Sequence, residues 1–157
     1  RAGGLPRRRR CMPVRMSHMN SQLDVAAILD PKANFLPTQT ATFCNVFAAA
    51  FLALRGRVVP LNKTANELAD WFSSPKAVGD GWRKATFEEA LKAANSDGDV
   101  VAVAKSLPHG HIAVCVESLP NTPGRLCVSA AGAANYVRAP IERSFGSLKP
   151  TFFVCQP

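Results

Sequence analysis

The chain has 157 residues, of which 47% are apolar and 19% are charged, a composition typical of one globular domain with a single core. No apolar run reaches the roughly 18–20 residues needed to cross a bilayer, which argues against a transmembrane segment. The formal net charge is +8, but the first 20 residues contain six arginines and no acidic residue, so the rest of the chain is almost neutral.

The N-terminal segment, residues 1–20, is rich in arginine and interrupted by glycine and proline, a pattern typical of disordered chain. An arginine run can bind nucleic acid or an anionic envelope polymer. No aromatic residues alternate with these arginines, so a stacking platform for single strands is not supported and no nucleic-acid partner is predicted. We interpret the segment as a solvated leader before one folded domain over residues 21–157.

The next segments are predicted to be helical. A short helix over 21–29 ends at Asp30-Pro31, and a loop follows over 31–40. The main helix is expected over 42–54, with Thr42 as its N-cap. Apolar residues at helical spacing predict the face that it buries, which consists of Phe43, Phe47, Ala50, Phe51 and Leu54.

Two further helices are predicted from capping boxes, in which a threonine is followed three residues later by a glutamate. Thr64 and Glu67 mark the helix within 62–74, and Thr86 and Glu89 mark the one within 86–95. The period then changes to that of strands, which are predicted over residues 99–106, 111–118, 125–130 and 151–155. Helices followed by hairpin-connected strands predict an α+β fold, with the N-terminal helices packed on a small antiparallel sheet.

The five cysteines are not spaced as a disulfide framework or as a metal site. No CxxC pair and no zinc-like Cys/His cluster occurs, so no metal or other cofactor is predicted. Cys115, Cys127 and Cys155 lie inside apolar strand-like runs and are expected to be buried free thiols. Cys11 lies in the N-terminal segment, and Cys44 begins the main helix.

Cys44 has the position of a thiol nucleophile. The thiolate is the reactive form, and unpaired backbone N–H groups in the first turn of a helix favour it. Cys44 lies off the predicted apolar stripe, so packing does not explain it. The Cys44 N–H group and the Gln39 side chain are candidate oxyanion donors, with an exposed loop position as the alternative for Gln39. Asn45 is expected to brace a loop.

A general base for this thiol has to come from three histidines. His18 lies near the arginine-rich segment, and His109 lies in a turn where solvation is expected. His111 opens the strand "HIAVCVES" and follows Gly110, which permits close approach of the backbone. His111 is therefore the predicted base.

The segments "TFCNVF", "ANELADWF", "VVAVAKSLPHGHIAVCVES" and "AAGAANY" occur in an order that resembles papain-like bacterial cell-wall amidohydrolases, similar to the NlpC and CHAP groups. The resemblance covers about residues 21–155. It implies a papain-like fold, cleavage of amide bonds in peptidoglycan peptides, Cys44 as nucleophile and His111 as base. It also implies a protein secreted or delivered to the bacterial envelope.

The third polar residue, which orients the imidazole in such enzymes, is where the chain departs from the resemblance. If the strands over 111–118 and 125–130 pair as a hairpin, the residues opposite His111 are expected near Ala130 to Gly132. The subgroup tends to carry glutamine at the place of Ala130, and alanine cannot hydrogen-bond through its side chain. Strict alternation would point Ser129 to the other face of the sheet. We include Asn135 as the candidate third catalytic residue. Alternatively, Asn135 only forms a turn, and a backbone carbonyl or a water orients the imidazole.

Two other functions fit the same residues. A papain-like toxin could deamidate or transamidate a protein, and a module with a weakened site could bind the cell wall without cutting it. The chain could be a phage lysin, a domain of a larger protein, or a delivered antibacterial effector, which would have an inhibitor or immunity protein as its partner. Glu88 and Glu89 are adjacent on a helix and do not suit a glycosidase pair.

Overall fold

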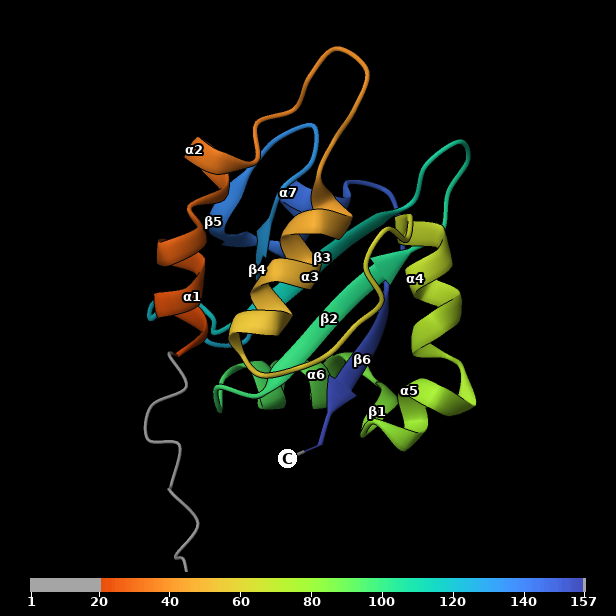
Figure 1. Ribbon diagram of the computed structural model, residues 1–157. Coiled ribbons are helices and arrows are strands. Elements are labelled where there is room, and N and C mark those ends of the chain that lie inside the picture. The colour runs from red at the N-terminus through yellow and green to blue at the C-terminus, as the bar shows by residue number, and fades with distance from the viewer. Residues whose placement is uncertain (1–20, 157) are drawn as a thin grey trace, which may run out of the picture.

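A six-stranded antiparallel sheet forms the centre of the computed structural model, which describes residues 21–156 (Figure 1). The strand order is β1-β6-β2-β3-β4-β5, and every neighbouring pair is antiparallel. This confirms the α+β class. The strands are β1 (Trp82–Ala85), β2 (Asp99–Ala104), β3 (His111–Val116), β4 (Cys127–Ala130), β5 (Tyr136–Pro140) and β6 (Thr151–Cys155).

Helices cover both faces of the sheet. Helix α3 lies across one face against β3, and α6 lies on the other, behind the sheet in Figure 1. None of the helices within residues 21–156 is long and apolar enough to cross a membrane. The helices are α1 (Gln22–Leu29), α2 (Pro31–Asn34), α3 (Cys44–Leu54), α4 (Ala65–Phe72), α5 (Pro75–Gly79), α6 (Phe87–Ala94) and α7 (Ile141–Phe145).

The core is divided by the sheet into two apolar clusters. Along β3, Ile112 and Val114 belong to the cluster under α3, whereas Ala113 and Cys115 belong to the cluster under α6 and α7. Successive side chains point to opposite faces in any strand, but here both faces of the sheet are buried. It explains why the strands read in the sequence as continuous apolar runs.

Both predicted capping boxes are confirmed. The Thr64 hydroxyl accepts from the Glu67 N–H while the Glu67 carboxylate accepts from the Thr64 N–H, and Thr86 and Glu89 form the same pair at α6. The short elements α2, α5, β1, β5 and α7 were not predicted. The predicted N-cap of α3 is wrong, because α3 begins at Cys44 and Phe43 precedes it without a side-chain cap.

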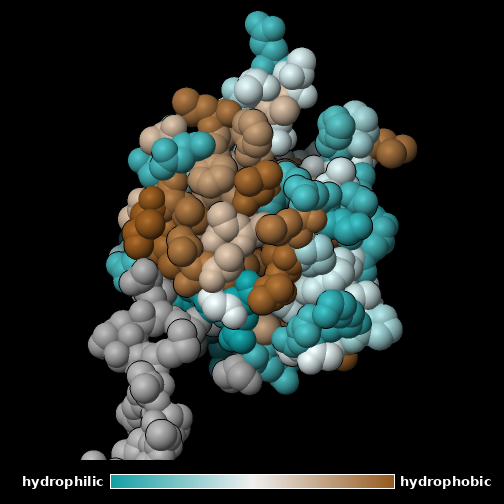
Figure 2. Space-filling model, viewed as in Figure 1, coloured by the Kyte–Doolittle hydropathy of each residue, from teal (hydrophilic) through white to brown (hydrophobic). Residues whose placement is uncertain are grey.

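The predicted buried face of α3 is also wrong in part. Phe47 and Phe51 are buried as expected, but Leu54 is 45% exposed and Cys44 only 5% exposed. Cys44 therefore lies on the buried face and in the core cluster. The periodicity misled because α3 is apolar almost all round. The exposed large apolar side chains include Ile28, Val46 and Leu54. Figure 2 shows apolar surface over α1 and α3.

Candidate active site

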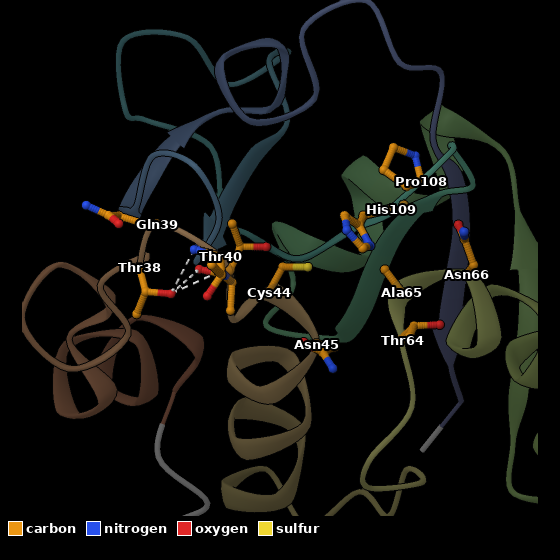
Figure 3. Close-up of a pocket in the computed structure, with 13 residues that line it drawn as sticks. Thr38, Gln39, Thr40, Cys44, Asn45, Thr64, Ala65, Asn66, Pro108 and His109 are labelled. Atoms are coloured by element: carbon orange, nitrogen blue, oxygen red, sulfur yellow. Dashed lines mark hydrogen bonds between the residues drawn. The ribbon is translucent and has the colours of Figure 1, made fainter.

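An open pocket of about 370 Å³ lies over the N-terminus of α3 (Figure 3). Cys44 and Asn45 line it from the helix, and the threonine-rich loop before α3 forms one wall. The opposite wall is formed by the start of α4 and by the loop that leads into β3. The lining residues are Thr38, Gln39, Thr40, Ala41, Thr42, Cys44, Asn45, Thr64, Ala65, Asn66, Pro108, His109 and Gly110.

Cys44 is the nucleophilic side chain of this pocket. Burial raises the pKa of its thiol above the ordinary value, and the backbone N–H groups of Ile112, Asn45 and Cys44 itself act in the opposite direction by stabilising the thiolate. The raised pKa means that the thiol carries its proton at neutral pH. A base must therefore remove that proton for the sulfur to attack a carbonyl group.

His111 is the first residue of β3, directly before the Ile112 N–H group that approaches the Cys44 sulfur. Its ring packs edge-on against Phe145, with 4.8 Å between the ring centroids, and its Nε2 atom lies 2.7 Å from the Ser144 hydroxyl. Burial lowers the pKa of His111 to about 4, so the imidazole is neutral at pH 7.

Within residues 21–156, no hydrogen bond joins the Cys44 thiol to the His111 imidazole, and His111 does not line the pocket. His109, two residues earlier, does line it, and its exposed imidazole is turned towards the same space as the Cys44 sulfur (Figure 3). The structure thus brings the Ile112 N–H group to Cys44 and places the side chain of His109 in the same pocket.

Asn135 does not reach the imidazole. Its Oδ1 atom accepts from the Gly132 N–H at 2.8 Å, and its Nδ2 donates to the carbonyl groups of Pro31 and Phe35 at 2.6 and 2.8 Å. These three bonds use its amide to tie the β4–β5 turn to α2. The turn-forming alternative is therefore the one that the structure supports, and we do not retain Asn135 as an orienting group.

The other polar candidates near the predicted site also have different roles. The buried Ser129 hydroxyl donates to the Tyr136 carbonyl at 3.2 Å. Asn45 donates to the Lys63 carbonyl at 2.7 Å and so braces the loop before α4, as expected. Gln39 lies on the exposed loop and lines the pocket, but Figure 3 shows its amide pointing away from Cys44.

Gly110 allows the loop that carries His109 to lie close to α4. Asn66 on α4 receives the Ser106 N–H and donates to the Ser106 carbonyl, which fixes this loop. A Cβ atom at Gly110 would lie 2.3 Å from the Asn66 Oδ1 and 2.6 Å from the Ala104 carbonyl oxygen. Both distances are far below van der Waals contact, so only glycine fits without movement of the backbone.

We expect Gly110→Ala to destabilise the protein by about 1–3 kcal/mol, as overpacking does, and to reduce any activity of the Cys44 site, because the backbone between His109 and His111 must shift. Chemical denaturation and an activity assay would measure both effects. Gly124→Ala is the matched control, since a Cβ atom there meets nothing within 4 Å. Equal unfolding free energies for the two variants would show that the close approach at Gly110 does not restrict the residue at that position.

Sequence reasoning missed one residue of the site, Ser144 of α7. Ser144 lies 33 residues from His111 in a helix of only five residues, and nothing in its spacing links it to a histidine. Gly132, in contrast, lies where the hairpin register predicts. That register places residues 130–132 opposite His111, and a Cβ atom at Gly132 would lie 3.2 Å from His111 Cε1. Strand pairing could therefore locate the neighbours of His111, but not the helix that covers it.

Within the described part of the chain, no group of three His, Cys, Asp or Glu side chains is arranged to hold a metal ion. Comparison with protein-family models and with curated proteins gave no match.

Proposed function

We propose that the chain is a papain-like cysteine amidohydrolase that cleaves amide bonds in the peptides of bacterial peptidoglycan, with Cys44 as nucleophile and His111 as base. The observation that carries the proposal is the position of Cys44, at the start of α3 and on the wall of an open pocket. The sequence resemblance supplies the substrate class. The threonine and asparagine side chains of the pocket suit it, because they can hydrogen-bond an extended peptide.

In the proposed reaction the neutral imidazole of His111 takes the proton from the Cys44 thiol, and the sulfur attacks the amide carbonyl. The oxyanion accepts hydrogen bonds from backbone N–H groups at the start of α3. The C–N bond then breaks, and the imidazolium gives its proton to the leaving amine. Water, activated by the same imidazole, hydrolyses the thioester and restores the thiol.

His111 is preferred to His109 because its ring is held by defined neighbours. Ser144 binds its Nε2 atom, Phe145 packs against the ring, and Gly132 approaches its Cε1 atom. The His109 side chain is exposed, and within residues 21–156 it makes no hydrogen bond. A base must be positioned accurately, and catalytic hydrogen bonds in unliganded enzymes often tighten only when substrate binds. We assign His109 to substrate contact at the pocket wall.

Digestion of purified sacculi by the wild-type protein tests this function. Mass spectrometry of the released fragments should show new amine and carboxyl ends at one type of peptide bond. Iodoacetamide should abolish release and EDTA should leave it intact. Binding to sacculi without release would instead indicate a non-catalytic module, and conversion of glutamine to glutamate in added proteins would indicate a deamidase; either outcome would contradict the proposal.

A further inference from the structure

A single side-chain hydrogen bond fixes the orientation of the His111 ring, and it comes from outside the sheet. The Nε2 atom of His111 lies 2.7 Å from the Ser144 hydroxyl oxygen. Ser144 is in α7, whose flanking residues Ile141 and Phe145 are buried and pack in the cluster beneath β3. The hydroxyl is therefore held at a defined place, not carried on a free loop.

The positions where the sequence suggested an orienting group do not supply one. Ala130 has no polar side chain, and the amide of Asn135 is bound to Gly132, Pro31 and Phe35. The Ser129 hydroxyl is bound to the Tyr136 carbonyl. Among the described residues, Ser144 is the one side chain that hydrogen-bonds the His111 ring.

The ring nitrogen that is hydrogen-bonded to Ser144 determines which of the two nitrogens of His111 can act as the base. A neutral imidazole carries its proton on one nitrogen and accepts on the other. If Nε2–H donates to the Ser144 hydroxyl, Nδ1 is the unprotonated nitrogen. Within residues 21–156, Nδ1 has no hydrogen-bond partner, so it remains available for the thiol proton.

We propose that Ser144 is the positioning residue of His111: its hydroxyl accepts the Nε2–H and holds the imidazole in the tautomer whose Nδ1 is the base. This inference rests on the proposed function, because it gives His111 a catalytic task. Ser144 takes the role that the resemblance assigned to a side chain at position 130, but from a different element, α7 in place of β4. The hydroxyl acts only through His111 and touches no substrate.

The test combines two readouts on Ser144→Ala, with Ser147→Ala as the matched control. Ser147 lies three residues further along, is exposed, and its side chain makes no hydrogen bond within the described residues. Nitrogen-15 NMR of the substrate-free protein should show wild-type His111 protonated at Nε2 and bare at Nδ1. Ser144→Ala should populate the other tautomer, whereas Ser147→Ala should not.

With sacculi as substrate, Ser144→Ala should lower kcat by about 10- to 100-fold with little change in KM, a part of the 10²–10⁴-fold that acid–base catalysis contributes. A wild-type His111 protonated at Nδ1, or an unchanged tautomer and kcat in Ser144→Ala, would overturn the inference. The NMR result needs no turnover, so it distinguishes this failure from failure of the proposed function, which inactivity of the wild-type protein on sacculi would reveal.

Discussion

Replacing Cys44 with alanine is expected to reduce release of peptide fragments from sacculi by at least about 10³-fold, because it removes the thiol that lines the pocket and forms the acyl intermediate in the proposed reaction. Cys127→Ala is the matched control. Both cysteines are free, buried and part of the same core cluster, so both variants lose a similar packing contribution. Only Cys44 lies at a helix start in the pocket. Equal activities of the two variants would contradict the assignment.

The pH dependence of this activity follows from the two shifted groups. Burial lowers the pKa of His111 to about 4, so the base stays unprotonated, and activity should persist, until the pH falls towards that value. Burial raises the pKa of the Cys44 thiol, so alkylation by iodoacetamide should accelerate as the pH rises past the range of an ordinary cysteine. An acid limb well above pH 4 would contradict His111 as the base.

Local sequence signals predicted the parts of the fold that local interactions determine. The capping boxes at Thr64 and Thr86 fixed the starts of α4 and α6, since each threonine and its glutamate satisfy backbone N–H groups within one turn. The strands β2, β3 and β6 were found because both faces of the sheet are buried and every residue after the first of each strand is apolar. The edge strands β1 and β5 carry polar residues and were missed.

The rotation of α3 could not be predicted from hydropathy. Its residues are apolar nearly all round, so several faces are almost equally able to face the sheet. Arg55, which follows the helix, determines which face of α3 packs on the sheet. It is 4% exposed and lies on the same face as Phe51, one turn earlier, and Cys44, three turns earlier. A buried arginine is not expected without a partner, and that partner is distant in sequence.

The candidate site could likewise be predicted only in part from the sequence. Cys44 could be selected from its place at a helix start, and the rung opposite His111 could be placed near Gly132 from the hairpin register. The contact of His111 with Ser144 could not, because it depends on how α7 docks beneath the sheet. His109 lies in the loop before β3, so alternation along the strand could not predict that His109 and not His111 lines the pocket.

The ionic cluster around Asp99 gives the largest expected effect on stability. Asp99, 3% exposed at the start of β2, accepts from Arg55 Nε at 2.8 Å and from Arg57 Nε at 2.7 Å. Arg55 also pairs with Asp97 at 3.0 Å. Burial alone would lower the pKa of Arg55, but the hydrogen bonds and charges of Asp99 and then Asp97 outweigh it, so the pKa is raised. The cluster joins the end of α3 to the sheet and so fixes the rotation that places Cys44.

We expect Asp99→Asn to lower the free energy of unfolding by about 3–5 kcal/mol, because it removes the buried carboxylate that pairs with both Arg55 and Arg57. Chemical denaturation at neutral pH measures this. Glu142→Gln is the matched control: its ion pair with Arg125, at 3.4 Å, is more than half exposed on both sides and should contribute at most about 1 kcal/mol. Because Arg55 and Cys44 share one face of α3, Asp99→Asn should also make Cys44 more accessible to iodoacetamide than in the control. Similar losses of stability in the two variants would show that burial of the Asp99 cluster does not hold the helix in place.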